Sequence, residues 1–463
     1  MKLKQQVLKA FLGCILRLVE SLQSFKGACP ERPIFNQKVT EVTPLNIPFT
    51  LVLISSTDIV EENTTVDIVS DSYQYQNSYL KRYLKYHYYV ARIKNRERSF
   101  AFGSIDLTNM ATLFDGIIYE SGKLHFVEGI QVWKNLTSDL LGKSALSDKW
   151  GMRKWVKEKK YMYYTEDDIE PWYRINDTLG VPSVRDKSGL SRVWRRQLDV
   201  KAEAINNQGN SREWYSNNKK VCGVNVLLDS YLMEKVYHYD IREAIHETII
   251  LYGALDFLYR IVDFAGIKQP NHFGFQIAKI TVVIKKNDPV TQQNVYPLAN
   301  KYMALISSMG LGDNRCLGIS FTFQNFRGIQ GQAWIGADET GIFMDKSSKR
   351  PANENQNVAY VNFFLYKKGG VRTRGSILSI LAHEVGHTFG AEHEEDTACI
   401  SSTILLMNSR SRESNRFDNF KFSKCNVRLI KRIIRKRMGK FIKCPHELRV
   451  YDDFFYPRYG RIC

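Results

Sequence analysis

The chain has 463 residues, of which 44% are hydrophobic and 12% aromatic, and its formal net charge is +18 at pH 7. This length predicts two or three domains, and the hydrophobic content is sufficient for a sizeable core. Internal repeats and low-complexity segments are absent from the sequence, which excludes a repeat protein and a largely disordered one.

Residues 1–28 have the composition of an atypical signal peptide. Lysines precede an apolar core at residues 10–16, which Arg17 and Glu20 then interrupt. Elsewhere the sequence never reaches the ~18 consecutive apolar residues that a membrane-spanning helix needs. Three N-glycosylation sequons also favour secretion, and they begin at Asn63, Asn135 and Asn176. We therefore expect a secreted, extracellular glycoprotein without a transmembrane anchor.

Residues 29–196 are expected to form a propeptide domain that ends in a charged linker. Residues 40–55 alternate between apolar and polar, and strand-like sequences follow at 88–93, 99–105 and 115–119. Because no catalytic group of residues occurs among these strands, a carbohydrate-binding or protein-binding β domain is the alternative interpretation.

A processing signal lies in the charge-dense linker. Arg192, Arg195 and Arg196 form a minimal R-x-x-R sequence. Basic clusters are common in a chain of this charge, but this one stands just before the next predicted strand. We expect proteolytic cleavage near Arg195 or Arg196.

Residues 197–443 alternate strands and helices. A strand is predicted at 224–229, a long helix at 241–267 and another strand at 280–284. This alternation predicts an α/β (α+β) domain, with a twisted mixed sheet and helices on both of its faces. Residues 444–463 follow as a short tail that contains cysteines.

The run from His383 to His393 carries the chemistry, because it fits the pattern H-E-x-x-H-x-x-G-x-x-H. On a helix, His383 and His387 lie one turn apart on one face, so both imidazoles can reach the same metal ion. Gly390 lets the chain leave the helix, and the turn brings back His393 as a third ligand. Three protein ligands leave one position of a zinc ion open, which is typical of a catalytic site.

Glu384 stands beside the predicted ligands, where it can act as the base on a zinc-bound water. A bare H-E-x-x-H sequence also arises on polar helix faces. Here, however, three of only nine histidines in the chain fall within this one motif. His246 has no second histidine four residues further on, so we interpret it as an ordinary helix residue.

The motif is that of the metzincin zinc metalloproteases, and the chain resembles their reprolysin (adamalysin) branch. Met407, in the apolar run 404–408, suits the methionine turn that metzincins place beneath the zinc ligands. Residues 331–336 and 422–426 resemble the segments that precede the zinc helix and the last helix of that branch. In size and layout the chain is similar to the secreted metalloproteases of tick saliva.

This resemblance implies a metzincin-type catalytic domain at 197–443, with a zinc helix, one catalytic Zn²⁺ and a small lower subdomain, preceded by a β-rich prodomain. It implies a secreted zinc-dependent endopeptidase that hydrolyses peptide bonds of extracellular proteins, with matrix or clotting proteins as substrates by analogy. The substrate is expected to lie extended along an edge strand near 331–335. No residue pattern supports a structural Ca²⁺ ion.

Two features depart from the reprolysin pattern. Glu394 stands where reprolysins usually have aspartate; because it keeps the charge, we expect altered packing rather than loss of activity. Many relatives also cap the zinc with a propeptide cysteine. No cysteine lies between Cys29 and Cys222, so only the distant Cys29 is left for such a switch.

Six cysteines of the C-terminal part are the disulfide candidates: Cys222, Cys316, Cys399, Cys425, Cys444 and Cys463. An even set in a secreted chain predicts three disulfides, for which fifteen pairings exist, and free buried thiols are the alternative. We favour Cys399 with Cys425, because these two flank the methionine turn.

Residues 426–443 contain eight basic residues and no acidic one. Apolar residues alternate with them, so a C-terminal helix with a solvated basic face is the simpler interpretation. The functional interpretation is an anionic partner such as heparin, an acidic protein or a membrane surface. Nucleic acid is not expected outside the cell. The alternative function is therefore a non-catalytic secreted binding protein on a metzincin scaffold, which acts through this basic, heparin-binding surface.

Overall fold

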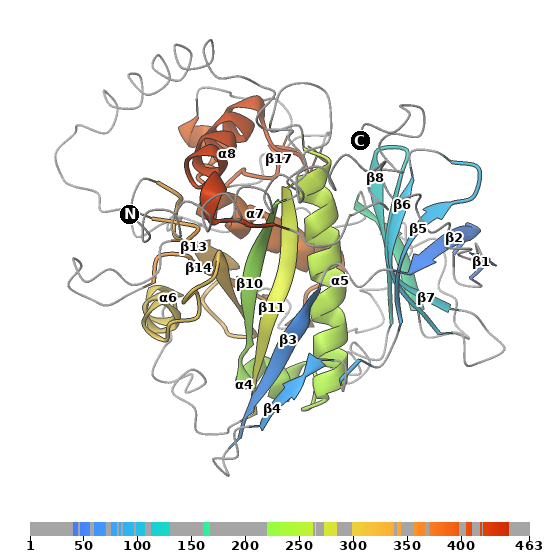
Figure 1. Cartoon of the computed structure of the whole chain (residues 1–463), viewed down its shortest axis with the longest axis horizontal. Helices are drawn as coiled ribbons and strands as arrows, with labels where there is room; N and C mark the ends of the chain where they lie inside the picture. Colours follow the sequence, from blue (N-terminus) through green and yellow to red (C-terminus); the bar gives the residue numbers. More distant parts are fainter. Residues whose placement is uncertain are drawn as a thin grey trace, which may run out of the picture.

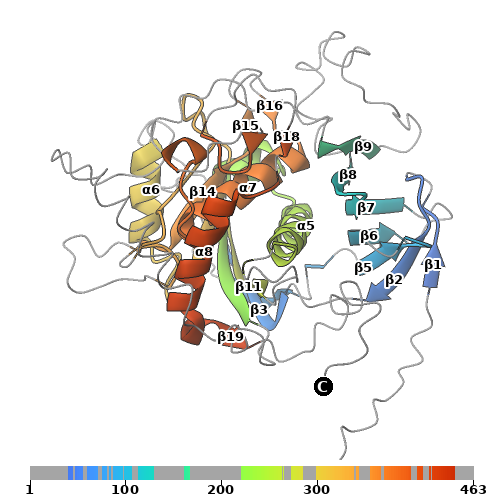
Figure 2. The ribbon, with the colours of Figure 1, turned by 90° about the horizontal axis from the view of Figure 1, so that it is seen from above.

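A computed structural model describes residues 40–129, 161–166 and 220–443, with short gaps inside the first and last ranges. We call the first two ranges the N-terminal part and the last range the C-terminal part. Two β-sheets lie on either side of one long helix, α5 (Ile241–Arg260) (Figures 1 and 2).

The N-terminal part forms a seven-stranded antiparallel sheet in the order β1-β2-β5-β6-β7-β8-β9. Its strands are β1 (Thr40–Val42), β2 (Leu51–Ser55), β5 (Tyr88–Ile93), β6 (Phe100–Asp106), β7 (Leu113–Glu120), β8 (Lys123–Gly129) and β9 (Tyr161–Thr165). The strand-like sequences at 88–93, 99–105 and 115–119 coincide with β5, β6 and β7. The strands that the sequence predicted in this half are therefore confirmed.

The second sheet is mixed and has the order β13-β14-β12-β10-β11-β3-β4, with β19 also paired to β10. Its strands from the C-terminal part are β10 (Lys220–Leu228), β11 (Phe273–Val283), β12 (Leu317–Thr322), β13 (Gly331–Ala333), β14 (Val358–Asn362) and β19 (Ile442–Lys443). Strands β10, β11, β12 and β14 run parallel, whereas β13 is antiparallel to β14. The predicted mixed sheet is confirmed.

Helices cover both faces of the mixed sheet, because alternate residues of its strands point to opposite sides. On β10, Val226 and Leu228 belong to the core with α5 and α7 (Arg374–Thr388). Leu227, between them, packs instead with α6 (Ala299–Ser308) on the other face. The sheet thus carries α7 on one face and α6 on the other, as the alternation of strands and helices predicted.

The sequence did not reveal that the N-terminal part also contributes to the mixed sheet. Strand β3 (Val60–Val69) lies parallel to β11, and β4 (Gln76–Tyr79) lies antiparallel to β3 at the end of the sheet. The chain therefore leaves the seven-stranded sheet after β2, adds two strands to the mixed sheet and returns at β5.

Helix α5 is buried on nearly all sides, with 16 of its 20 residues buried. Asp240 caps its first turn by accepting hydrogen bonds from the backbone N–H groups of Arg242 and Glu243. The helix ends at Arg260 rather than at residue 267, because Phe264 turns back into the core against Tyr259. A helix with apolar residues on every side needs a packing partner on every side, and the two sheets provide them.

The remaining elements are short or lie near the C-terminus of the described chain. They are α4 (Ser230–Lys235), β15 (Phe364–Leu365), β16 (Gly370–Val371), η4 (Glu394–Asp396), β17 (Ile404–Leu405), β18 (Phe417–Asp418), α8 (Lys424–Lys436) and η5 (Met438–Lys440).

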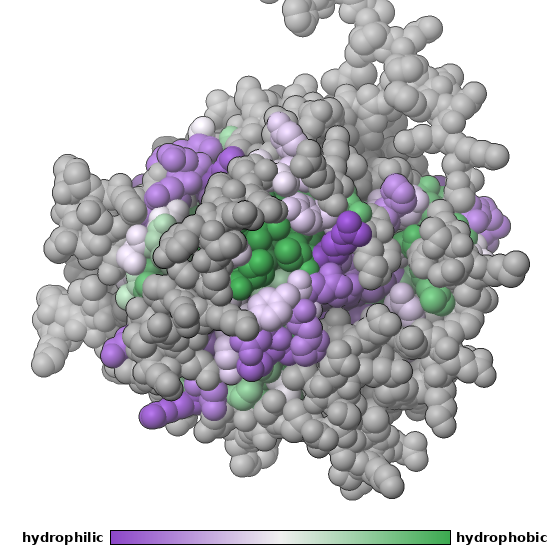
Figure 3. Space-filling view, turned by 90° about the horizontal axis from the view of Figure 1, so that it is seen from below, coloured by the Kyte–Doolittle hydropathy of each residue, from purple (hydrophilic) through white to green (hydrophobic). Residues whose placement is uncertain are grey.

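The surface of the described residues shows few large hydrophobic side chains. The exposed ones are Tyr79, Leu84, Tyr239 and Met309. On the face drawn in Figure 3, hydrophobic residues gather near the centre and hydrophilic ones border them. None of the helices in the described part of the chain combines the length and the apolar character of a membrane-spanning segment.

One disulfide joins β10 to the start of β12, between Cys222 and Cys316. Cys425 is also disulfide-bonded. Cys399, Cys444 and Cys463 lie outside the described residues, so the pairing of Cys399 with Cys425 stays a prediction.

Replacing Cys222 and Cys316 together by alanine should lower the free energy of unfolding by about 2–5 kcal/mol. The bridge joins residues that are 94 positions apart, so its removal enlarges the unfolded ensemble. Urea unfolding followed by tryptophan fluorescence measures the change. Reduced wild-type protein should lose at least as much stability, because reduction also opens the disulfide of Cys425; an unchanged midpoint in the double mutant would contradict a stabilising role.

Candidate metal centre

Helix α7 carries the predicted ligands through the core. Thr373 caps its start by accepting a hydrogen bond from Ser376 N, and apolar residues such as Leu381 and Val385 are fully buried. Tyr259 of α5 donates a hydrogen bond to the carbonyl oxygen of Ala382, which fixes the helix at the level of the ligands. The side chains of α7 near this level therefore have little freedom to move.

Two backbone carbonyl groups set the orientation of the helical histidines. The Nδ1 atom of His383 lies 2.7 Å from the carbonyl oxygen of Leu406, and that of His387 lies 2.8 Å from the oxygen of Ala391. A carbonyl oxygen only accepts, so Nδ1 carries the proton in each ring. The opposite nitrogen, Nε2, is then unprotonated and available as a ligand.

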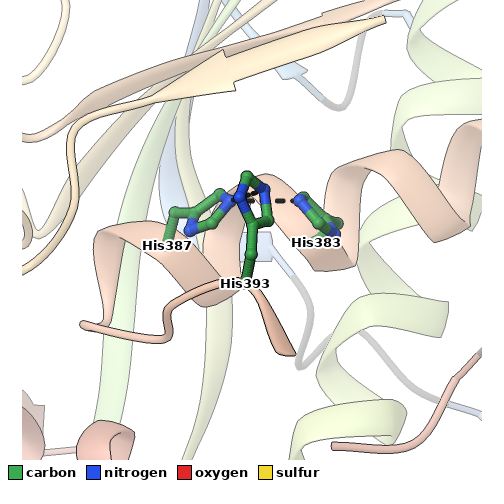
Figure 4. A group of neighbouring side chains, drawn as sticks. All are labelled: His383, His387 and His393. Carbon is green, nitrogen blue, oxygen red and sulfur yellow. Dashed lines mark hydrogen bonds between the residues drawn. The ribbon is translucent and has the colours of Figure 1, made fainter. Parts of the chain in front are cut away.

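The three histidine Nε2 atoms converge on one point (Figure 4). The Nε2 atom of His387 is 3.0 Å from that of His383 and 3.2 Å from that of His393. Lone pairs that face one another at this distance repel unless a cation lies between them. Nitrogen ligands about 2.0–2.1 Å from a tetrahedral zinc ion are themselves roughly 3.3 Å apart. The spacing and the donor set therefore fit zinc.

The surroundings of these imidazoles favour their neutral form. Burial and the neighbouring imidazoles lower the pKa of His387 well below its usual value. Burial and His383 lower the pKa of His393 to about 3, and burial also lowers the pKa of His383. Neutral imidazole is the form that binds a metal ion, so the site does not have to lose protons at neutral pH before it can bind one.

Glu384 is buried beside β13, the terminal strand of the mixed sheet. A Cβ atom on Gly331 would lie only 2.5 Å from Oε1 of Glu384, so the glycine makes room for this carboxylate. In the sequence, the only sign of this contact was the glycine at the start of the strand. The sequence did not show that the Glu384 side chain occupies the space a larger residue would fill. The edge strand and the predicted base are thus neighbours.

Met407, the residue predicted for the methionine turn, packs against α7 at Gly386. It is fully buried, and a Cβ atom on Gly386 would lie 2.7 Å from its sulfur atom. Its carbonyl oxygen accepts a hydrogen bond from Glu394 N, which ties the turn to the segment after His393. The sulfur lies below the helix that carries the ligands, where it supports their backbone.

The chain leaves α7 through Gly390, whose φ angle is +94°. This left-handed conformation suits glycine, and a side chain here would also meet Ile433 of α8. The predicted role of this glycine in returning His393 is consistent with that geometry.

Sequence reasoning missed Asn426, which holds the segment around His393. Its side-chain amide nitrogen donates to Oε1 of Glu394 at 2.8 Å, and its oxygen accepts from Glu392 N at 2.9 Å. Burial raises the pKa of Glu394. The residue that departs from the reprolysin pattern is therefore bound to the first turn of α8. The only sequence signal was the position of Asn426 in the segment 422–426.

The other predicted site residues are not brought to this centre. Asn63 lies in β3, whereas Asn135, Asn176 and the processing arginines Arg192, Arg195 and Arg196 lie outside the described residues. His246 lies in α5 and outside the metal centre, as predicted, and it is buried between the two parts of the chain, with Nδ1 2.9 Å from the hydroxyl of Tyr88.

Residues 218–421 match the Reprolysin_5 family model, described as metallo-peptidase family M12. The chain is 23% identical over 381 residues to the disintegrin and metalloproteinase domain-containing protein 10 of Bos taurus, and equally to that of Homo sapiens. Each alignment covers 76% of this chain and 46% of the relative, so the chain spans about half of the length of these relatives. The protein of the same name from Xenopus laevis is 26% identical over 301 residues, with 59% and 39% covered.

These relatives are vertebrate proteins, so the resemblance to tick enzymes stays a prediction. Peptidases of family M12 use zinc, which agrees with the donor set of the three histidines. Strands β10 to β14 of the mixed sheet, α7 and the histidine cluster all fall within the matched residues. Residues 218–421 therefore form a metallopeptidase domain of family M12, of the reprolysin type of metzincin.

Proposed function

We propose that the chain is a zinc-dependent endopeptidase in which His383, His387 and His393 hold the metal and Glu384 is the general base. The observation that carries this proposal is the convergence of three histidine Nε2 atoms beside the helix that also presents Glu384, with Nε2 left unprotonated in His383 and His387. The family match supports a metalloprotease and protein substrates. When bound, zinc supplies Lewis-acid chemistry, since it makes water more acidic and polarises a carbonyl group.

Glu384 takes a proton from the attacking water and passes it to the leaving nitrogen of the cleaved peptide bond. The carboxylate lies against Gly331, so the base stands beside the terminal strand of the sheet. A substrate peptide that adds to this strand through backbone hydrogen bonds would bring its scissile bond close to the base. This geometry favours an extended peptide as the substrate.

We further propose that the protein is secreted, with residues 29–196 as a processed segment and 197–443 as the peptidase domain. The signal-like start and the sequons support secretion, and the Cys222–Cys316 disulfide is typical of an oxidising compartment. The arginine cluster at 192–196 stands in the sequence between the two parts of the chain.

A second candidate function rests on the exposed basic face of α8, which could bind heparin. Arg428, Arg432 and Lys436 are all exposed and stand four residues apart, so they share one side of the helix. Not every basic residue of this segment is solvated, however. Arg437 is buried and donates to the carbonyl oxygens of Ile342, Ala337 and Thr340, so its role is structural.

Glu384→Gln should keep zinc near one per molecule while lowering turnover by at least about 10²–10⁴-fold, because the amide cannot accept the proton of water. His383→Ala, His387→Ala and His393→Ala should each lose metal affinity instead. Metal analysis and a quenched-peptide assay separate these two outcomes. If Glu384→Gln kept near-wild-type turnover, Glu384 would not be the base.

Arg428→Gln, Arg432→Gln and Lys436→Gln together should elute from heparin at lower salt than the wild type, because exposed charges attract a polyanion and salt screens them. Cleavage of a short neutral peptide should be unchanged. The matched control neutralises Arg242, Lys301 and Arg327, which are exposed away from α8 in the same part of the chain. Equal elution shifts in both triple mutants would assign retention to net charge rather than to α8.

N-terminal sequencing of the secreted, active protein should find a chain that begins near Gln197, because the R-x-x-R sequence ends at Arg195 and Arg196 follows it. Arg192→Ala with Arg195→Ala should leave the chain uncut at this position. Active protein in which the only chain begins near Cys29, with no second chain that begins near Gln197, would contradict processing there.

A further inference from the structure

The two parts of the chain share one sheet. Thr64 of β3 donates its hydroxyl to the carbonyl oxygen of Ile277 at 2.8 Å, and Ile284 N donates to the oxygen of Val69 at 2.9 Å. Lys279 also pairs with the buried Asp67. Without β3, the edge of β11 would present unpaired backbone groups, which makes a strand prone to aggregation.

A second contact runs along α5. The rings of Phe100 and Phe257 stack with their centroids 4.1 Å apart, and the ring of Phe102 lies against the backbone of Gly253. His246, Gly253 and Phe257 are seven and then four residues apart, so they form one face of the helix. The opposite face, with Tyr252 and Tyr259, packs on the peptidase sheet and α7.

A third contact is a buried ion-pair network around Arg374, the first residue of α7. Its Nη1 atom donates to Oδ1 of Asp115 at 2.7 Å and to the carbonyl oxygen of Val127 at 2.6 Å. Its Nε and Nη2 atoms donate to both carboxylate oxygens of Glu247 on α5. Asp115 also lies 3.3 Å from Nε2 of His246. The peptidase helices thus depend on a carboxylate from the N-terminal part.

The N-terminal part also caps the helix that carries the proposed zinc ligands. The backbone N–H of Arg374 points at the carboxylate of Glu128, at 3.3 Å from each oxygen, and Gly375 N donates to the hydroxyl of Tyr164 at 2.9 Å. The first N–H groups of a helix have no partner within the helix, and a carboxylate there also stabilises the helix dipole. Removing the N-terminal part would leave these donors without their partners.

These contacts lie away from the edge strand that the proposed substrate would join. In both ribbon views, the seven-stranded sheet is on one side of α5 and β14 is on the other, where Figure 1 also shows β13 (Figures 1 and 2). A bound N-terminal part is therefore compatible with access to β13 as far as the described residues are concerned.

We propose that residues 40–166 stay bound to residues 220–443 after the chain is cut between them, so that the mature protein consists of two chains. The N-terminal chain is then a structural subunit that completes the peptidase sheet and caps α7. Association can be measured whether or not the protein is active and whether or not Arg196 is the natural cleavage point.

The test uses the full chain with a protease site inserted after Arg196 and with Cys29→Ser. Apart from Cys14 in the signal-like segment, Cys29 is the one cysteine before Cys222. Without it, the N-terminal fragment has no cysteine after that segment that could form a disulfide with the other fragment. Fully cut protein at micromolar concentration should elute from a size-exclusion column as one species of the uncut size. Its two fragments should separate on a non-reducing denaturing gel. Separate elution of the fragments in native buffer would overturn the proposal.

Two variants test whether the contacts above hold the fragments together. Asp115→Ala removes one of the two buried carboxylate partners of Arg374, and Glu247 remains as the other. The substitution should weaken association of the fragments by about 100-fold or more. Gly253→Ala is sharper, because alanine favours a helix more than glycine does. The added Cβ would meet the Phe102 ring at 2.1 Å, so the α5 helix should gain stability while the fragments bind more weakly.

The matched control is Glu41→Ala, which breaks an exposed ion pair with Lys94 within the N-terminal part. Dilution of the cut proteins, followed by size-exclusion chromatography, gives the dissociation constants. We expect the control to match the wild type and both interface variants to dissociate at higher concentration. Association that is unchanged in both interface variants, or weakened equally in the control, would overturn the assigned interface.

Discussion

The structure depends on the burial of α5 between two sheets. One face of this helix packs on the mixed sheet and α7, and the other face packs on β6 and β7 of the N-terminal part. Two residues of α5 also bind α7: Tyr259 donates a hydrogen bond to the carbonyl oxygen of Ala382, and Glu247 accepts one from Arg374. Because α7 presents the three-histidine centre, the position of that centre rests on contacts that reach both parts of the chain.

Close backbone approaches define the metal centre as much as its ligands do. Gly331 leaves space for Glu384, Gly386 leaves space for the sulfur of Met407, and Gly390 lets the chain turn against α8. A methyl group at any of these positions would meet another atom at 2.5–2.7 Å. Protein interiors are packed too densely to absorb such an overlap without movement. The site is therefore built from small residues around a few large ones.

The formal charge of +18 does not describe the surface by itself. Arg260, Arg374 and Arg437 are buried, where their guanidinium groups bind carboxylates or backbone carbonyl oxygens. A guanidinium group offers five donors in a fixed plane, which suits such multiple contacts. Only the exposed basic residues, such as those along α8, can attract an anionic partner.

The sequence by itself determined the elements and residues whose signals are local. The strand at 88–93 follows from its residue types, and the shared face of His383 and His387 follows from the period of a helix. The turn at Gly390 and the third histidine belong to the same short motif, so the proposed ligands could be named without a fold.

Tertiary structure alone decided which distant segments meet. Thr64 binds the carbonyl group of Ile277, 213 residues further along the chain, and Asn426 binds Glu394 from another helix. A strand pattern states that a segment will pair but not with which strand, and a buried polar residue does not name its partner. The joining of β3 to the peptidase sheet and the capping of α7 by Glu128 were therefore beyond sequence reasoning, because both depend on contacts that only the folded chain creates.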